Sequence, residues 1–298
     1  MNKNLKVAFL VQCHKNPNQV NHLVDSLLKV TNIDVFIHVD QKSEKIRSQI
    51  KSNSFVHILP KKKCVNVKWG EISQCIATLN LIEEALKYDK FDFYILISGQ
   101  DYLIKKVDTL IDFLYEHKNE GFMEFVPEEN EGYYHFDKRN DLYYPAWMIN
   151  KKFYVRVLRK LYVTFTGIHK TLKIFSRKRY FDHMYYGSSW WCLPEDSIKV
   201  IFQYCQEHPK LLEYFKHSIC PDESLFQTLI KNLCSEVVIN DNLTYVDWSE
   251  GGSSPKNLDF DDLDSILKMK DKFFARKFDE DLNPGILDRL DSMIDEMG

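Results

Sequence analysis

The segment Val7-Ala8-Phe9-Leu10-Val11 decides the fold, because an unbroken apolar run of this length is typical of a strand buried on both faces. Pro17 then opens a helical stretch with one apolar face, and a second strand is predicted over residues 33–39. The alternation continues with a helix at 44–50, a strand at 55–59, a helix at 72–88 and a strand at 93–97. Strands that alternate with helices over short connections predict an α/β fold, with helices on both faces of a mainly parallel, Rossmann-like sheet.

Polar residues follow three of these predicted strands. Gln12-Cys13-His14 follows the first strand, Asp40 follows the second, and Gly99-Gln100-Asp101 follows the fourth. Ligands of open α/β sheets bind beyond the carboxyl ends of the strands. We therefore expect the binding site at this edge of the sheet.

The second half of the chain has weaker periodicity. Residues 128–147 are aromatic and polar, which predicts a long functional loop or insertion. A strand is predicted over 185–193, a helix after Pro194, and another helix opened by Pro221-Asp222-Glu223. The tail is expected to form helices broken near Lys277 and Pro284, with the acidic clusters at 259–262 and 279–281 on solvated helix faces.

Composition and charge narrow the function classes. Hydrophobic residues make up 44% of the chain and charged residues 28%, as in folded globular proteins. The net charge of −3 argues against a nucleic-acid partner. The seven cysteines form no CxxC pair, and no signal-peptide or membrane-length apolar run is visible, so we expect a cytoplasmic protein.

Several common site motifs are missing from the sequence. It contains no G-x-G-x-x-G after the first strand, no P-loop, no H-E-x-x-H and no G-x-S-x-G. The histidines are not grouped at metal-ligand spacing, and the strand ends carry single acids, Asp40 and Asp101, in place of a D-x-D. We therefore expect neither a metal nor another cofactor.

Five segments in a fixed order carry a resemblance to a known family. They are Phe36-Ile37-His38-Val39-Asp40 with Lys42-Ser43, Val67-Lys68-Trp69-Gly70, Leu96-Ile97-Ser98-Gly99-Gln100-Asp101-Tyr102, Gly187-Ser188-Ser189-Trp190-Trp191 and Pro221-Asp222-Glu223-Ser224-Leu225. Two later segments reinforce it, Asp247-Trp248-Ser249-Glu250-Gly251-Gly252 and Phe274-Ala275-Arg276-Lys277-Phe278-Asp279. Together they resemble the core-2/I-branching β-1,6-N-acetylglucosaminyltransferase and peptide O-xylosyltransferase family (glycosyltransferase family 14-like). The chain lacks the paired cysteines of secreted members, as expected of a bacterial-type cytoplasmic member.

The resemblance implies a GT-A-like fold, a UDP-sugar donor, inversion at the anomeric carbon and no metal requirement. Inverting transfer needs a base that takes the proton of the acceptor hydroxyl, and a carboxylate within hydrogen-bond reach is the usual choice. Glu223 corresponds to the base of the family. The alternative is that Asp222 and Glu223 only complement a helix dipole, an effect of about 0.3–1 kcal/mol.

Cationic side chains must neutralise the departing diphosphate if no metal does so. The resemblance assigns this role to Lys277, with Arg276 beside it and Lys256 as the second basic candidate further upstream. The competing interpretation for each is a solvent-exposed cation.

The nucleoside end of the donor is expected at the first two strand ends. Val11 and Gln12 are predicted to line the uracil pocket through their backbones. Asp40 either contacts the nucleoside, as the resemblance implies, or caps the following turn.

Acceptor contacts are expected from aromatic and acidic residues of the matching segments. The candidates are Gln100, Asp101, Trp190, Trp248 and Glu250. A turn-stabilising role competes for Gln100 and Asp101. One of Trp190 and Trp191 is expected in the core, because neighbouring residues of a strand face opposite sides. The remaining acceptor contacts fall in residues 128–147, which cannot be aligned with the family.

Residues 151–179 contain many Lys and Arg residues but neither Asp nor Glu. Phe153, Val157, Leu161 and Phe165 recur near helical spacing, so the stretch predicts a basic amphipathic helix. One interpretation is peripheral contact with the inner membrane face, near a lipid-linked acceptor. The alternative is a helix whose apolar stripe packs on the domain.

The sequence thus predicts one glycosyltransferase domain over residues 1–298. Residues 1–125 form its nucleotide-binding half, 126–185 an insertion with the basic aromatic stretch, and 186–298 the acceptor and catalytic half. The predicted reaction is metal-independent transfer of GlcNAc from UDP-GlcNAc to a glycan hydroxyl in surface polysaccharide assembly. UDP-xylose is the alternative donor, and a membrane-peripheral carbohydrate-binding protein without turnover is the alternative of another class.

Overall fold

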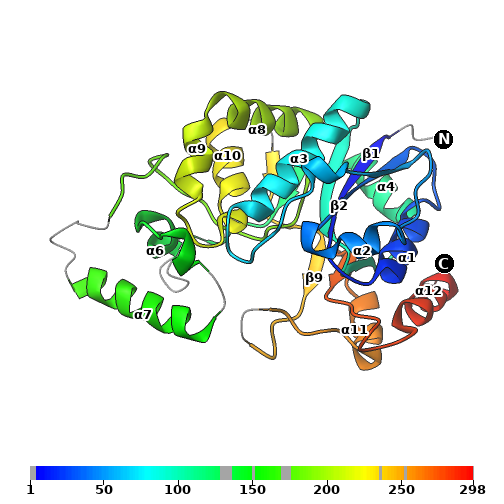
Figure 1. Ribbon diagram of the computed structural model, residues 1–298. Helices are drawn as coiled ribbons and strands as arrows, with labels where there is room; N and C mark the ends of the chain where they lie inside the picture. The colour runs from blue at the N-terminus through cyan, green and yellow to red at the C-terminus, as the bar shows by residue number, and fades with distance from the viewer. Residues whose placement is uncertain are drawn as a thin grey trace.

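The computed structural model describes residues 5–127, 136–149, 152–168, 176–234, 237–251 and 254–297 (Figure 1). Its main sheet has seven strands in the order β3-β2-β1-β4-β7-β6-β8. These strands are β1 (Val7–Cys13), β2 (Ile33–Val39), β3 (Val56–Ile58), β4 (Phe93–Ser98), β6 (Glu120–Met123), β7 (Trp191–Pro194) and β8 (Val237–Ile239). β7 is antiparallel to both of its neighbours and every other pairing is parallel, so the predicted mainly parallel α/β sheet is confirmed.

Strand β1 lies inside the sheet and contributes to the two large cores on its opposite faces. Phe9 and Val11 point into one apolar cluster, whereas Ala8 and Leu10 point into the other on the opposite face. This alternation explains why the strand is apolar throughout, since both of its faces are buried.

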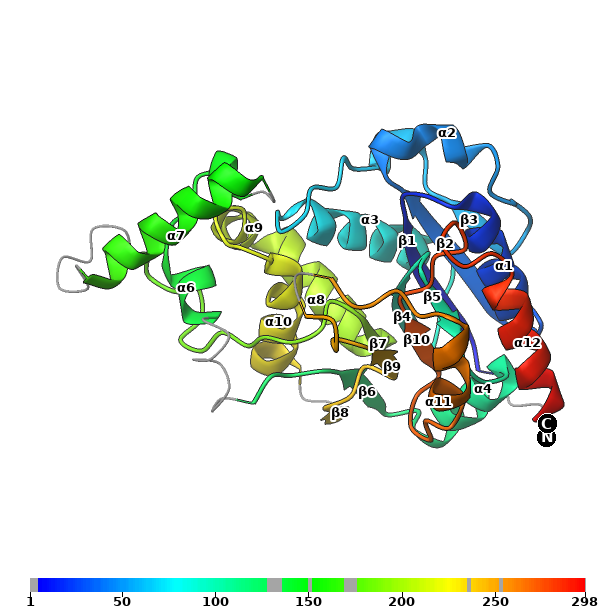
Figure 2. The same ribbon diagram turned by 90° about the horizontal axis from the view of Figure 1, so that it is seen from below.

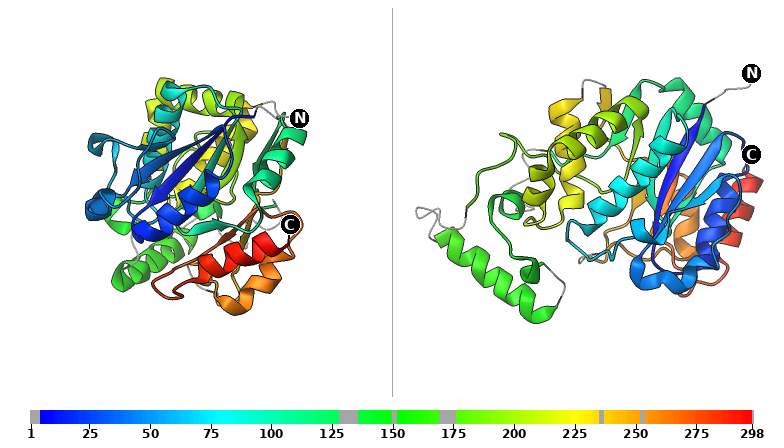
Figure 3. Two further views of the ribbon diagram at one scale, coloured as in Figure 1. Left: turned by 90° about the vertical axis from the view of Figure 1, so that its right-hand side faces the viewer. Right: turned by 45° about the horizontal axis from the view of Figure 1, so that its top comes forward.

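Helices cover each face of the sheet, as predicted (Figures 2 and 3). One core receives side chains from α1 (Pro17–Leu27), α4 (Val107–Glu116), α11 (Leu263–Leu267) and α12 (Ile286–Glu296). The other receives them from α3 (Ser73–Tyr88), α8 (Glu195–Glu207), α9 (Pro209–Phe215) and α10 (Leu225–Leu233). The short helix α2 (Glu44–Arg47) lies between β2 and β3 in the sequence.

The tail contains a strand that the sequence did not predict. β10 (Phe274–Arg276) lies between β5 (Asp101–Leu103) and β9 (Thr244–Val246) in a second, three-stranded sheet. The expectation of a purely helical tail was therefore wrong. It failed because the partners of this short strand come from distant parts of the chain, so no local periodicity marks it.

Two further expectations need correction. Only the end of the predicted strand at 185–193 is a strand. Residues before it bond instead to α10 and to the turn that precedes it: Tyr185 N–H donates to Thr228 of α10, and Gly187 N–H donates to Glu223 of the turn. Pro221 opens a 3₁₀ turn (Pro221–Glu223), and α10 begins only at Leu225.

The described residues of the insertion form two helices on one side of the molecule. They are α6 (Phe136–Asp141) and α7 (Phe153–Ile168), joined through a 3₁₀ turn at Ala146–Met148. Helix α7 projects from the body in all views (Figures 1 and 2). The predicted loop positions 128–135 lie outside the described residues. None of the helices in the described ranges has both the length and the apolar character that a membrane crossing requires.

Candidate active site

The strand order reverses at β1, which makes its carboxyl end the topological switch point of the sheet. From β1 the chain continues outward through β2 and β3, and then returns to place β4 on the other side of β1. A small pocket opens there, as the strand-end rule predicts. Its lining consists of Gln12, Cys13, His14, Lys15, Ser98, Gly99 and Gln100.

Gly99 allows the two strand ends to approach this closely. A Cβ atom at this position would lie 2.9 Å from Val20 and 3.0 Å from Cys13, so any side chain would push β1 and α1 away. The Gly99 N–H donates to the Gln12 carbonyl, and the Gln19 side chain donates to the Gly99 carbonyl, both at 2.9 Å.

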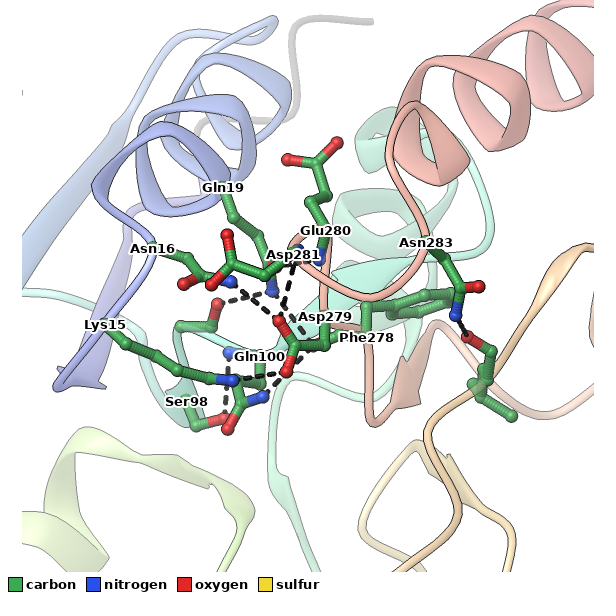
Figure 4. A network of polar contacts seen from close by, with 12 residues as sticks. Lys15, Asn16, Gln19, Ser98, Gln100, Phe278, Asp279, Glu280, Asp281 and Asn283 are labelled. Atoms are coloured by element: carbon green, nitrogen blue, oxygen red, sulfur yellow. Dashed lines mark hydrogen bonds and ion pairs between the residues drawn. The ribbon is translucent and has the colours of Figure 1, made fainter.

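The tail segment that contains Lys277 is fastened to this pocket (Figure 4). The Phe278 N–H donates to the Gln100 carbonyl at 2.9 Å, and the Gln100 side chain donates back to the Phe278 carbonyl at 3.2 Å. Asp279 is buried, forms an ion pair with Lys15 and accepts a hydrogen bond from Asn16. Its expected position on a solvated helix face was therefore wrong, because this carboxylate ties the tail to the β1–α1 loop.

Positive charge collects around the pocket. Burial lowers the pKa of His14, and the nearby charges of Lys15 and Lys277 lower it further. An anion bound here would meet Lys277 and also Lys15, which Asp279 already pairs with, beside an imidazole whose pKa is lowered.

The other residues predicted at the two strand ends are engaged within the protein. Asp40 caps the next turn, accepting a hydrogen bond from Lys42 N–H at 2.9 Å, which is the alternative that the sequence left open. The Gln12 side chain donates to Thr78 at 2.8 Å. Val11 is buried between β2 and β4, in register with Ile37 and Ile97, and its backbone contact with the donor stays a prediction.

Arg276 lies one residue before Lys277, and its side chain belongs to a buried cluster. Its Nε lies 3.3 Å from the carboxylate of Asp101, and its guanidinium lies 4.4 Å from the centre of the Trp190 ring. Asp101 is 0% exposed, and burial raises its pKa while Arg276 opposes that rise. Asp101 therefore holds Arg276 in place, and it has no exposed surface for an acceptor.

The Arg276 guanidinium keeps unused hydrogen-bond capacity. Within the described part of the chain, its buried Nε and Nη1 have no hydrogen-bond partner. Trp190 covers one face of the group, and Trp191 lies in the core as expected for one member of this pair.

Glu223 is placed by three segments that are far apart in the sequence. Cys220 adopts a left-handed conformation with φ of 51°, and its N–H donates to the Gly70 carbonyl at 2.9 Å. The Gly187 N–H donates to the Glu223 carbonyl at 2.9 Å. A Cβ atom on Gly187 would lie 1.7 Å from the Glu124 carbonyl oxygen, so only glycine fits beside this turn.

Two polar partners surround the carboxylates of the turn. The Glu223 side chain is 37% exposed and accepts a hydrogen bond from Arg139 of α6 at 2.5 Å. Asp222 accepts one from the Ser189 hydroxyl at 2.7 Å. Burial, followed by the charge of Glu223, raises the pKa of Asp222 to about 6.

These contacts connect the switch-point pocket with the Glu223 turn. Ser189 contacts Asp222, its neighbour Trp190 stacks on Arg276, and Arg276 is followed by Lys277 at the pocket. The structure thus places the predicted base and two of the three predicted phosphate-binding cations, Arg276 and Lys277, along one continuous row of residues.

Three predicted residues lie away from this row. Trp248, which is 56% exposed, and Glu250 occupy the exposed turn after β9. Lys256 lies 2.8 Å from both carboxylate oxygens of Asp262, and these pairings raise its pKa. We therefore leave Lys256 out of the proposed donor site.

Three residues of the site were not predicted from the sequence: Lys15, Arg139 and Ser189. Lys15 lies one position beyond the strand-end residues named above, so extending that rule by one residue would have found it. Ser189 was inside a matched segment but had no assigned role. Arg139 lies in the segment that could not be aligned, and no pattern distinguishes it from the lysines and arginines nearby.

The described residues contain no group of three or more His, Cys, Asp or Glu side chains that could hold a metal ion. The carboxylates of Asp40, Asp101 and Asp279, which lie near the pocket, each bond to other residues of the protein.

Comparison with known proteins adds independent information. The family model described as Branch: Core-2/I-Branching enzyme matches residues 7–270. The chain is 25% identical to xylosyltransferase oxt of Drosophila pseudoobscura pseudoobscura over 98% of its length, and 22% identical to human xylosyltransferase 1 over 96%. It covers 34% and 30% of these proteins respectively, so it spans about a third of the curated relatives it matches.

Among solved structures, the mannose-6-phosphate isomerase of Helicobacter pylori aligns over 70% of this chain and 78% of its own. The TM-score of 0.32 and the 13% identity are too low to bear on the fold or the function. The family match, in contrast, covers most of the chain and includes the Glu223 turn. The chain therefore belongs to the Core-2/I-branching enzyme family of glycosyltransferases.

Proposed function

We propose that this protein transfers a sugar from a UDP-sugar to a glycan hydroxyl with inversion, using Glu223 as the catalytic base. The observation that carries the proposal is the row of residues from the Glu223 turn through Trp190 and Arg276 to Lys277. It supplies a partly exposed carboxylate at one end and cations at the other, which are the parts that an in-line displacement requires.

The reaction forms one bond and breaks one bond at the anomeric carbon. The acceptor oxygen attacks this carbon while the bond to the UDP oxygen breaks, and the electron pair of that bond leaves with UDP. Glu223 takes the proton of the acceptor hydroxyl. Lys277 and Arg276 offset the charge that develops on the diphosphate, and Arg139 holds the Glu223 carboxylate in position.

The donor sugar has two candidates. We propose GlcNAc, in agreement with the branching enzymes that the sequence resembles. Xylose is the alternative, and it is favoured by the names of the relatives, which are xylosyltransferases. UDP release from a panel of UDP-sugars tests both, because donor hydrolysis without acceptor already reveals the sugar. A protein that binds glycans but releases no UDP from any donor would contradict the proposal.

We propose that the transfer requires no metal. Lys277 near the switch point supports this, because it can supply positive charge that a divalent cation would otherwise provide, and Arg276 keeps hydrogen-bond donors beyond its ion pair with Asp101. Activity should therefore persist in EDTA. Loss of activity in EDTA that Mn²⁺ restores would overturn this part of the proposal.

We also propose that the protein acts in a reducing compartment such as the cytoplasm. No disulfide joins any two of the seven cysteines, which all lie within the described ranges, and six of them are buried, as is typical of reduced core cysteines. Unfolding in urea should then be insensitive to dithiothreitol, and a lower unfolding midpoint in the reductant would contradict this placement.

A further inference from the structure

Helix α7 carries an exposed apolar face that the transfer reaction does not use. Six large apolar side chains of this helix are between 43% and 82% exposed. They are Phe153, Tyr154, Val157, Leu158, Leu161 and Phe165. Because successive helix positions turn by about 100°, these six side chains fall within one arc of about 140°. The sequence left open whether the apolar stripe packs on the domain, and the structure shows that it faces outward.

The opposite side of α7 fastens the helix to the protein. Val155 is buried, and the Tyr162 hydroxyl donates to the Tyr143 carbonyl at 2.8 Å. Arg159 is half-buried and lies 3.4 Å from the Met148 carbonyl. The orientation of the exposed apolar face is thus fixed by contacts on the inner side of the helix.

The basic residues of this region divide into two groups. Arg177 bonds to Tyr214 and Ser218, and Arg179 forms a bidentate pair with Asp141, so both are engaged within the protein. Arg156 and Lys160 are exposed on α7, and Lys152 is exposed directly before it. Arg156 and Lys160 fall beside the apolar arc, about 60° and 20° from its edge. The described part of α7 carries no acidic residue.

We propose that the exposed face of α7 docks the protein on an anionic lipid bilayer. Large apolar side chains in one plane, with cations along the border and no acids, match the boundary between acyl chains and anionic headgroups. A soluble protein partner would need charges of its own to match the basic border, whereas an anionic bilayer presents them everywhere. The docking is independent of the donor sugar and of the base.

Docking through α7 would also bring the Glu223 turn close to the membrane. Helix α7 contacts the turn at Ala146–Met148, Tyr162 packs edge-on against Tyr144 at 5.6 Å, and Tyr144 bonds to the Lys138 carbonyl. Arg139, the next residue, holds Glu223. An acceptor anchored in the same bilayer would therefore lie near Glu223, the proposed base.

The test is flotation of the intact protein with vesicles of equal parts phosphatidylcholine and phosphatidylglycerol, compared with pure phosphatidylcholine. The protein should float with the anionic vesicles, less with the neutral ones, and less as salt increases. Arg156→Gln/Lys160→Gln should weaken binding about 25-fold, at about fivefold for each cation. Lys118→Gln/Lys210→Gln removes the same charge from exposed positions elsewhere and should change nothing.

A second pair of variants tests the apolar face. Phe153→Ser/Leu161→Ser should weaken binding at least about tenfold, whereas Leu282→Ser, which removes an equally exposed leucine elsewhere, should not. Release of UDP in the absence of lipid should be the same for all of these variants, which separates this proposal from the catalytic one.

Three results would overturn the docking proposal. The first is wild-type protein that floats with neither kind of vesicle. The second is a loss of binding in the control variants as large as that in the α7 variants. The third is a lipid-free dimer that Phe153→Ser/Leu161→Ser dissociates, because the face would then belong to a second copy of the chain.

Discussion

The buried pair of Arg276 and Asp101 gives the sharpest prediction for stability. Asp101 is 0% exposed and the Arg276 side chain is 13% exposed, with Nε and Oδ1 separated by 3.3 Å. At an effective dielectric constant of about 20, their attraction is about 5 kcal/mol, which offsets the cost of burying both charges. Arg276→Met removes the attraction but leaves the Asp101 carboxyl buried. We expect this variant to lose about 3–5 kcal/mol of unfolding free energy.

Urea unfolding followed by circular dichroism measures this loss. Asp101→Asn should be destabilised by a similar amount, because the guanidinium is then buried without its counter-charge. The double variant should lose clearly less than the sum of the two single losses. Arg289→Met, at an exposed arginine of α12, is the control and should stay within about 0.5 kcal/mol of wild type.

The dependence on pH gives a second check of the same pair. Burial raises the pKa of Asp101, and the positive charge of Arg276 opposes this rise. Without Arg276, the pKa of Asp101 in the folded state rises further. Ionisation of this carboxyl then lowers the free energy of unfolding as the pH rises. The penalty of Arg276→Met should therefore grow from acidic to neutral pH. Additive single losses, each under about 1 kcal/mol, would refute the reasoning.

Three further predictions concern the site and the docking of α12. Lys277→Met should weaken UDP binding about 10- to 100-fold in calorimetry, and Lys256→Met should leave it unchanged because Asp262 already pairs with that amine. If Lys256→Met weakened UDP binding more than Lys277→Met, Lys256 would instead belong to the donor site. Arg139→Gln should lower the transfer rate about tenfold with unchanged UDP affinity, because the Glu223 carboxylate loses its partner at 2.5 Å. A transfer rate equal to that of wild type would contradict this role of Arg139. The hydrogen bond to Asp291 raises the pKa of His22 above 6.5, so His22→Gln should cost about 1 kcal/mol below pH 6.5 and progressively less as the pH rises through the folded-state pKa. Urea midpoints at several pH values measure this, and a cost that increases with pH would contradict it.

The parts of the fold that the sequence predicted well are those with a local cause. Residues 33–39 form β2 with the predicted bounds, and 72–88 differs from α3 by one residue. Both elements owe their pattern to burial, on two faces for the strand and on one side for the helix. Glu223 was predicted as the base through the resemblance, and the structure adds what surrounds it.

The missed features depend on contacts between distant residues. Asp279 looks like a solvated acid in the sequence, and it is buried because Lys15, 264 positions away, pairs with it. β10 is a strand only because β5 and β9 flank it. Arg139 reaches Glu223 across 84 positions, from a segment without periodicity. For α7, the amphipathic pattern predicted the helix, but only the anchoring of Val155 and Tyr162 fixed which side faces outward.

The central claim is that Glu223 is the base and that it does not hold the donor. The most direct test measures Glu223→Gln for both transfer and UDP binding, with Glu213→Gln, at an exposed glutamate of α9, as the control. We predict that Glu223→Gln lowers the transfer rate about 10²- to 10⁴-fold while its affinity for UDP stays within about twofold of wild type. A transfer rate within tenfold of wild type, or an equal loss of UDP affinity, would contradict the assignment.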